Sequence, residues 1–415
     1  MNRPHVSRSP RILYYSHDTY GLGHLSRSLA LAKATARRLP RAQQMIVTGS
    51  PVARDLGRGA PVELVLLPPV IKVGPERYAP REPGPSLESV LALRARALLA
   101  AARRFRPDLV VIDHAPLGLQ GEALPLLGWL RARRPATRIV LGLRDIVDSP
   151  RTVRQNWRAK GVYPVLEHSY DRILVYGDRS VYDTARAYAI PPSVRRRLRH
   201  VGYLGRTLPA RSVELARRPD AGRRLLVTAG GGGDGGPLFD AALAMVEAGR
   251  LPAEDRLHLV LGPLLDVSAR MALHGRAAAL AQVTVTDFAA TMAPIWAATD
   301  AVLTMGGYNS LTEVVGQRLP CLVVPRTQPR REQLIRALAF EQRLGGQLRV
   351  LRPERLSAAA LAEALETLPR RRGVRPPMDL GGLPRFAEAI AELVGEGREP
   401  APRPGLEPRL TAVGA

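Results

Sequence analysis

The first residues that could do chemistry lie in the segment 20–27, YGLGHLSR, which follows an apolar run at 12–16. Gly21 and Gly23 let the backbone approach a ligand closely, and the start of the following helix carries a partial positive charge suited to an anion. His24, with an ordinary pKa of about 6.5, could serve as a general base near neutral pH. Glycines at such a turn are also common for packing reasons, so a structural and a catalytic interpretation both stay open.

A second candidate site is the loop 229–237, AGGGGDGGP. Six of its residues are glycine, and Pro237 suits the first position of a helix. Such a backbone can donate several N–H groups to a phosphate, although the Lys and Ser/Thr that complete a Walker A loop are missing. We expect a diphosphate-binding loop; a flexible surface loop is the alternative. The residues expected to bind the diphosphate are Gly230, Gly231, Gly232 and Gly233.

The elements that position these loops can be read from the hydrophobic pattern. Short apolar runs alternate with longer amphipathic stretches from residue 11 onwards, and the same pattern begins again near residue 224. This alternation predicts an α/β fold with parallel sheets covered on both faces. The predicted strands are 12–16, 45–48, 62–67, 109–112, 138–142 and 172–176, then 224–228, 257–261, 283–286, 301–304, 321–324 and 347–350. The predicted helices include 25–39, 87–105, 236–247, 330–344 and 383–394.

The pattern divides the chain into two doubly wound, Rossmann-like domains that face an interdomain cleft. We expect an N-terminal domain over 1–205, a C-terminal domain over 206–395 and a disordered tail over 396–415, where Pro, Gly and Arg are frequent. In such folds, ligands collect at the carboxyl ends of the strands. The loops after the strands are therefore the places to search for a site.

A third segment, residues 285–337, contains several motifs in a fixed order. They are VTDF (285–288), MAPIWAATD (292–300), MGGYNSLTE (305–313), LP (319–320), VP (324–325) and REQLIRA (331–337). In order and spacing this segment resembles the MurG-type glycosyltransferases, which carry the two-domain GT-B fold and transfer a sugar from a nucleotide diphosphate. The resemblance extends more weakly over the whole chain and is poorest at 72–85.

The resemblance implies a donor site in the C-terminal domain. Glu313, expected in the first turn of a helix, would accept hydrogen bonds from the ribose hydroxyls, although the helix dipole also favours an acid there. Arg206 would contact a phosphate, and Phe288 and Ala289 would present backbone groups to uracil. Glu332 and Gln333 would face the sugar; a glutamate at 332 departs from the family's usual glutamine and argues against N-acetylglucosamine. The other expected donor-binding residues are Met292, Gly307, Asn309 and Ser310.

The resemblance also implies an inverting transfer in which the acceptor hydroxyl loses its proton as it attacks. His24 is the first candidate for the base and Asp113 the second. We find no Asp-x-Asp pair in a suitable loop and no His/Cys cluster with ligand spacing, so we expect neither a metal nor another cofactor. The expected acceptor-side residues are Gly21, Gly23, His114, Arg144 and Asp145.

The net charge of +24 suits anionic partners, but aromatic residues make up only 5% and the charges are spread along the chain, so nucleic acid is not expected. The basic residues of the helix 87–105, Arg94, Arg96, Arg103 and Arg104, could rest on an anionic membrane, or the helix could face the core with a solvated basic side. We expect a cytoplasmic protein, with weak contact to the inner face of the cell membrane left open.

The partners are thus expected to be a nucleotide-sugar donor, UDP-linked by the family's usage, and an unidentified acceptor that is lipid-linked, a polysaccharide or a small molecule. Two alternatives remain. A nucleotide-sugar 2-epimerase would use the same fold and nucleotide site without an acceptor. A non-catalytic polyanion-binding protein would bind through its basic surface and lose affinity steeply with salt.

Overall fold

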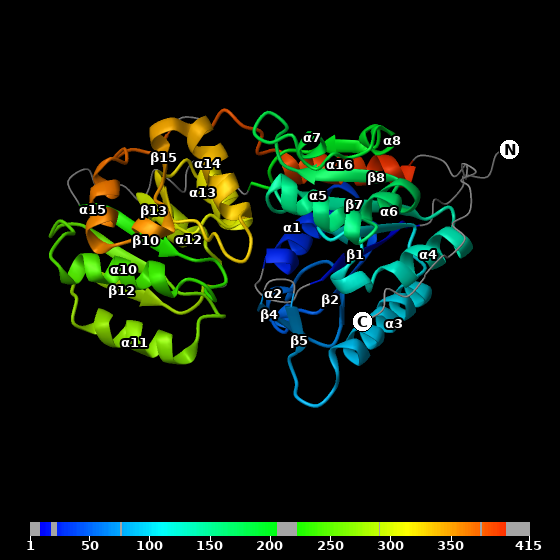
Figure 1. Cartoon of the computed structure of the whole chain (residues 1–415), viewed down its shortest axis with the longest axis horizontal. Helices are drawn as coiled ribbons and strands as arrows, with labels where there is room; N and C mark the ends of the chain where they lie inside the picture. The colour runs from blue at the N-terminus through cyan, green and yellow to red at the C-terminus, as the bar shows by residue number, and fades with distance from the viewer. Residues whose placement is uncertain are drawn as a thin grey trace.

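Two parallel sheets organise the computed structural model, which describes residues 9–17, 23–74, 77–205, 222–289, 291–373 and 376–395. Helices cover both faces of each sheet (Figure 1). The α/β class and the two Rossmann-like domains predicted from the hydrophobic pattern are confirmed.

The first sheet has seven parallel strands in the order β3-β2-β1-β6-β7-β8-β9. Its central strands are almost continuously apolar because both of their faces are buried, as in β6, whose residues are all buried. The strands are β1 (Arg11–Ser16), β2 (Gln43–Thr48), β3 (Glu63–Leu66), β6 (Leu109–Asp113), β7 (Arg138–Arg144), β8 (Arg172–Tyr176) and β9 (Leu198–His200). A separate antiparallel pair, absent from the sequence prediction, is formed by β4 (Val70–Gly74) and β5 (Arg77–Pro80).

The helices of this half lie between successive strands. They are α1 (Gly23–Arg38), α2 (Ala53–Leu56), α3 (Leu87–Phe105), η1 (Leu119–Gly121), α4 (Leu124–Arg133), α5 (Pro150–Ala159), α6 (Val162–Ser169), α7 (Thr184–Ala187) and α8 (Pro192–Arg195). Helix α3 has the predicted bounds. Ser86, the residue before it, is its N-cap, and the Ser86 side chain accepts a hydrogen bond from the Ser89 backbone N–H.

The second sheet has six parallel strands in the order β12-β11-β10-β13-β14-β15. They are β10 (Arg224–Thr228), β11 (Arg256–Val260), β12 (Val283–Thr286), β13 (Ala301–Thr304), β14 (Cys321–Val323) and β15 (Leu348–Val350). The helices that follow are α10 (Gly236–Glu247), α11 (Val267–Ala278), α12 (Ala293–Ala297), α13 (Tyr308–Gly316), α14 (Glu332–Leu344), η2 (Gly345–Gln347), η3 (Pro353–Arg355), α15 (Ala358–Glu366) and α16 (Gly382–Gly395).

The last helix, α16, returns to the first half of the chain, whereas the sequence division placed it in the C-terminal domain. It lies against α1 and close to β8 (Figure 1). The ring of Phe386 packs edge-on against Tyr176 of β8. The apolar face of α16 completes a core cluster that includes Leu29 of α1 and Leu311 of α13. Because periodicity shows that a helix has an apolar face but not what that face covers, the sequence could not reveal this crossing.

Arg94 does not belong to the exposed basic face that the sequence predicted for α3. Its side chain is fully buried, and Nε lies 2.7 Å from Oε2 of Glu122, a carboxylate that approaches from the loop before α4. A guanidinium is stable in such a place only when a carboxylate compensates its charge. The face of α3 available to an anionic surface therefore lacks one of its four predicted arginines.

Candidate functional site

The site lies where the carboxyl ends of the two sheets meet. In each sheet the chain order reverses at the first strand, β1 or β10, and loops leaving such a switch point form a crevice. A cleft of about 650 Å³ opens there, lined by residues of both halves. The predicted residues that it brings together are Gly23, Arg144, Gly230, Gly231, Gly232, Gly233, Phe288, Ala289, Met292, Gly307, Asn309, Ser310, Glu313, Glu332 and Gln333.

Six predicted residues are not among those that line the cleft. Gly21, Arg206 and the tail 396–415 fall outside the described residues, so their placement stays a prediction. The other four are described but do not line the cleft: His24, Asp113, His114 and Asp145. Two of them, His24 and Asp113, contact Arg27, which does line it.

His24 and Asp113 form a hydrogen-bonded pair. His24 lies in the first turn of α1, and its Nδ1 is 2.7 Å from Oδ2 of Asp113, the last residue of β6. Burial raises the pKa of Asp113, but the charge of Arg27 and hydrogen bonds from His24 and Arg27 outweigh burial and hold the pKa well below its ordinary 3.8. An ionised carboxylate only accepts hydrogen bonds, whereas Arg27 Nη2, 2.9 Å from the same Nδ1, only donates, so the two contacts of Nδ1 require opposite tautomers of His24.

Arg27 is the residue that sequence reasoning missed in this group. Its Nε and Nη2 donate to the two oxygens of Asp113 at 2.9 and 2.5 Å, and the guanidinium is almost fully buried. Arg27 is three residues after His24 and therefore on the same face of α1. That spacing was the available signal, but it is weak in a chain with 61 basic residues.

Two further histidine rings, those of His17 and His114, lie beside this pair. The ring centroids of His17 and His24 are 4.2 Å apart, and those of His24 and His114 are 5.5 Å apart. Burial, then like-charged neighbours, keep the pKa of both His17 and His114 well below 6.5, so these rings are neutral at neutral pH. His114 has a positive φ of 63°, an unusual backbone conformation for a residue other than glycine.

Asp145 has a different role from the one predicted. Instead of facing an acceptor, its carboxylate binds Arg336 of α14, with Nη2 to Oδ1 at 2.8 Å and Nε to Oδ2 at 3.1 Å. Both side chains are almost completely buried. The pair joins the two halves of the chain because a buried guanidinium needs a carboxylate, and here Arg336 of α14 finds it in Asp145, directly after β7.

The glycine-rich loop is held by close backbone approaches. Gly232 has a φ of +90°, and a Cβ there would lie 2.2 Å from the carbonyl oxygen of Leu261. Only glycine satisfies both conditions. The loop leads into α10, which begins at Gly236 and has a proline in its first turn as predicted.

Arg326 links this loop to the residues expected at the sugar, and it was also missed. Its Nη1 lies 2.5 Å from Asp234 Oδ2 in the loop, and its Nη2 lies 2.8 Å from Glu332 Oε1. The backbone N–H of Arg326 donates to Gln333 Oε1 at 3.0 Å. The second oxygen of Glu332 is buried and has no hydrogen-bond partner among the described residues.

Helix α13 carries the residues expected at the nucleotide. It begins at Tyr308, so Glu313 lies in its second turn and not in the first, which weakens the helix-dipole explanation for an acid there. Oε2 of Glu313 accepts a hydrogen bond from Trp296 Nε1 at 3.3 Å. Asn309 Nδ2 donates to the Gly23 carbonyl at 3.1 Å, which brings the starts of α13 and α1 together. Phe288, 44% exposed, lines the same cleft.

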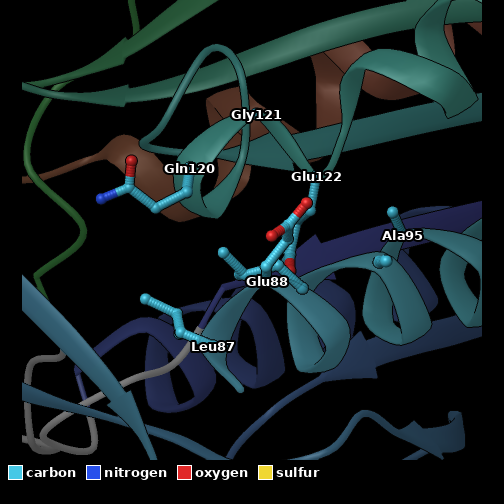
Figure 2. A pocket seen from close by; sticks show the side chains of 8 residues that line it. Leu87, Glu88, Ala95, Gln120, Gly121 and Glu122 are labelled. Carbon is cyan, nitrogen blue, oxygen red and sulfur yellow. The ribbon is translucent and has the colours of Figure 1, made fainter. Parts of the chain in front are cut away.

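A second hollow of about 630 Å³ lies on the first half of the chain between α3 and the loop before α4. Figure 2 shows Gln120, Gly121 and Glu122 on that loop opposite Leu87, Glu88 and Ala95 of α3. None of the predicted site residues lines it, so we place the candidate site in the interdomain cleft.

The described residues contain neither a metal-binding cluster nor a membrane-spanning helix. No group of three or more His, Cys, Asp or Glu side chains within these ranges is arranged to hold a metal ion. Every helix within them is too short or too polar to span a bilayer.

Comparison with known proteins defines the class. Residues 246–379 match the Glycosyltransferase family 28 C-terminal domain. Solved GT-B glycosyltransferases share the architecture over nearly the whole chain, and together these findings make the protein a glycosyltransferase. No curated protein matches it in sequence.

Three similar structures show how far the likeness reaches. The calicheamicin glycosyltransferase CalG4 is 21% identical, with a TM-score of 0.57 over 94% of this chain and 96% of its own. Phytolacca americana UGT2 is 17% identical, with a TM-score of 0.59 over 93% and 94%. Acinetobacter baumannii MurG is 14% identical, with a TM-score of 0.56 over 93% and 99%. At these identities the likeness establishes the fold.

Proposed function

We propose that this glycosyltransferase moves a hexosyl group from a UDP-sugar to an acceptor hydroxyl, with inversion and without a metal ion. The observation that carries the proposal is that one cleft is lined by the glycine-rich loop, Glu313 and Glu332 from one half of the chain, and from the other half by Arg27, which binds Asp113 of the His24–Asp113 pair. Donor-binding and proton-accepting groups are thus placed on facing halves of the chain.

In the proposed donor complex, the backbone N–H groups from Gly230 to Gly233 and the start of α10 stabilise the diphosphate as it leaves. Glu313 accepts hydrogen bonds from the ribose hydroxyls, and Phe288 lies against the base. The unpartnered oxygen of Glu332 accepts a hydrogen bond from a sugar hydroxyl. The UGT2 structure is complexed with UDP-2fluoro-glucose and pterostilbene, which supports a UDP-sugar as the donor in this fold.

His24 is the proposed base, and Asp113 is its positioning residue. Asp113 is a poor base itself because its pKa is far below neutral and Arg27 occupies both of its oxygens. In this proposal the shorter of the two Nδ1 contacts, that with Asp113 at 2.7 Å, selects the tautomer in which Nδ1 donates to Asp113 and His24 Nε2 accepts the proton from the acceptor hydroxyl. The imidazolium that forms is then stabilised by the Asp113 charge.

The proposal predicts that His24→Ala removes turnover and spares nucleotide binding. Proton NMR would follow the anomeric signals of UDP-glucose, UDP-galactose and UDP-N-acetylglucosamine, with a panel of hydroxylated acceptors. We expect a turned-over donor to yield free UDP and a product of inverted anomeric configuration. His24→Ala should lower this rate by about 10²- to 10⁴-fold.

Calorimetric titration with UDP provides the control, because His24 is not expected to touch the nucleotide. The UDP dissociation constant of His24→Ala should stay within about twofold of the wild-type value, below the ~1 kcal/mol of one ordinary hydrogen bond. Conversion of the UDP-sugar into its 2-epimer with the glycosidic phosphate bond intact would contradict the transferase proposal and support the epimerase alternative.

A further inference from the structure

Arg144 is a cleft residue that the proposed chemistry does not use. It is the last residue of β7, and its side chain lines the interdomain cleft. Among the described residues it forms no ion pair, and its side chain contacts one neutral ring, that of His114, which can accept a hydrogen bond at only one of its two nitrogens. Arg144 is only partly exposed, and a partly desolvated guanidinium without a carboxylate partner is costly, so a bound anion would stabilise it.

Neighbouring arginines show what a compensated guanidinium looks like in this part of the molecule. Arg27 binds Asp113, Arg336 binds Asp145, and Arg326 binds both Asp234 and Glu332. Burial, and then the positive charge of Arg27, lower the pKa of Arg144 to about 9. The negative charge of Glu332 offsets only part of this effect, and no carboxylate among the described residues forms an ion pair with Arg144.

The geometry leaves Arg144 with unused donors. Nη2 lies 2.8 Å from His114 Nε2; because a guanidinium only donates, this ring nitrogen accepts. A guanidinium has five N–H groups in a planar fork, so most of them stay available. His114 itself is held in a left-handed conformation by a hydrogen bond from its backbone N–H to the Gly142 carbonyl at 2.6 Å. Residues in such conformations cluster at functional sites.

His114, which Arg144 contacts, lies close to the proposed base, His24. The His114 ring is 5.5 Å from that of His24, centroid to centroid. His17 packs against His24 and presents a buried Nδ1 that has no partner among the described residues. A group bound at Arg144 would therefore lie about one sugar ring from the proposed base.

We propose that Arg144, positioned by His114, binds a carboxylate or phosphate group that a substrate carries close to the reacting centre. This inference rests on the proposed function and specifies the substrate: either the acceptor or the transferred sugar is anionic. The planar fork suits two parallel hydrogen bonds to such a group, and neutral His17 and His114 add no charge that would need compensation.

The test compares wild-type protein with Arg144→Gln, Arg144→Lys and the surface control Arg96→Gln, which removes the same charge from an exposed position of α3. The acceptor arm titrates inorganic phosphate into protein saturated with UDP and, separately, into protein without UDP. The donor arm compares UDP-glucuronate with UDP-glucose. Unfolding temperatures of all variants are recorded.

We expect Arg144→Gln to weaken the binding of phosphate, or of UDP-glucuronate relative to UDP-glucose, by about 10- to 100-fold, the range for losing hydrogen bonds to a charged group. The arm that responds identifies the anionic substrate. Arg144→Lys, which keeps the charge without the fork, should lose less and also serves if the glutamine variant does not fold. Arg96→Gln should change neither arm.

Two results would overturn the inference. If Arg144→Gln and Arg144→Lys leave both arms unchanged, no anion binds at this position. If they weaken UDP itself as strongly as either probe, Arg144 belongs to the diphosphate site. Failure of wild-type protein to bind UDP would instead count against the proposed donor, while phosphate binding without UDP would still report on Arg144.

Discussion

At the residue scale, the group around Asp113 shows which parts of a site a sequence can reveal. His24 and Asp113 were identifiable because each polar residue follows or begins an element at the expected ligand-binding edge. Arg27, Arg326 and Arg336 were not, since arginine is frequent throughout this chain and no spacing separates a buried arginine from a solvated one. Their roles depend on which carboxylate the fold brings near them.

The variant Asp113→Asn tests how much the Asp113 carboxylate stabilises the folded protein by pairing with Arg27. The change leaves Arg27 buried without its carboxylate, which should lower the free energy of unfolding at pH 7 by about 3–5 kcal/mol. The folded-state pKa of Asp113 is depressed, so its stabilisation is fully present above the ordinary value of 3.8 and is lost as pH falls below that value. Urea unfolding from pH 7 to pH 3 would measure the difference.

Asp55→Asn is the matched control, because Asp55 belongs to an exposed pair with Arg58 and should cost about 0–1 kcal/mol. An Asp113→Asn protein as stable as the control at pH 7 would show that the Asp113 charge does not hold Arg27.

At the element scale, most strands and several helices were predictable because parallel strands buried on both faces stand out as apolar runs. The edge strand β9 was not predicted, because it has only three residues and none of them is fully buried. The bounds of α3 and α10 agree with those predicted. The pair β4–β5 was missed because its strands are short and only partly apolar, and the partner of α16 could not be read from its own periodicity. The glycine-rich loop was recognisable by composition, but its shape depends on the neighbouring strand.

Gly232→Ala tests that shape. The new Cβ would meet the Leu261 carbonyl at 2.2 Å in a residue whose φ is +90°, so the loop must move. We expect a loss of about 1–3 kcal/mol in unfolding free energy and at least about tenfold weaker UDP binding, the loss of one or two hydrogen bonds to a charged group. Differential scanning calorimetry and UDP titration would measure the two effects.

Gly249→Ala provides the comparison, since Gly249 also has a positive φ of 64° but nothing lies within 4 Å of the added Cβ. It should share part of the destabilisation and keep the UDP affinity. If Gly232→Ala binds UDP as tightly as Gly249→Ala and the wild type do, the 230–236 loop does not bind the diphosphate.

At the scale of the whole molecule, the two halves are joined by specific buried contacts and a shared apolar core. The Asp145–Arg336 pair, the hydrogen bond from Asn309 to Gly23 and the packing of α16 on α1 connect them. These contacts bring the proposed nucleotide helix, α13, to the start of the helix that carries His24. A sequence with a repeated α/β pattern predicts two domains, but the way they face each other follows from contacts between distant residues.

The central claim is that this cleft binds the nucleotide of a sugar donor through Glu313. The most direct measurement is a thermal-shift and calorimetric titration with UDP on wild-type protein, Glu313→Ala and Glu354→Ala, an exposed acid of the same half. At one hundred times its dissociation constant, UDP should stabilise the wild type and Glu354→Ala by about 2.7 kcal/mol. Glu313→Ala should lose most of this effect while keeping its own fold. Equal stabilisation of all three proteins, or of none, would contradict the claim.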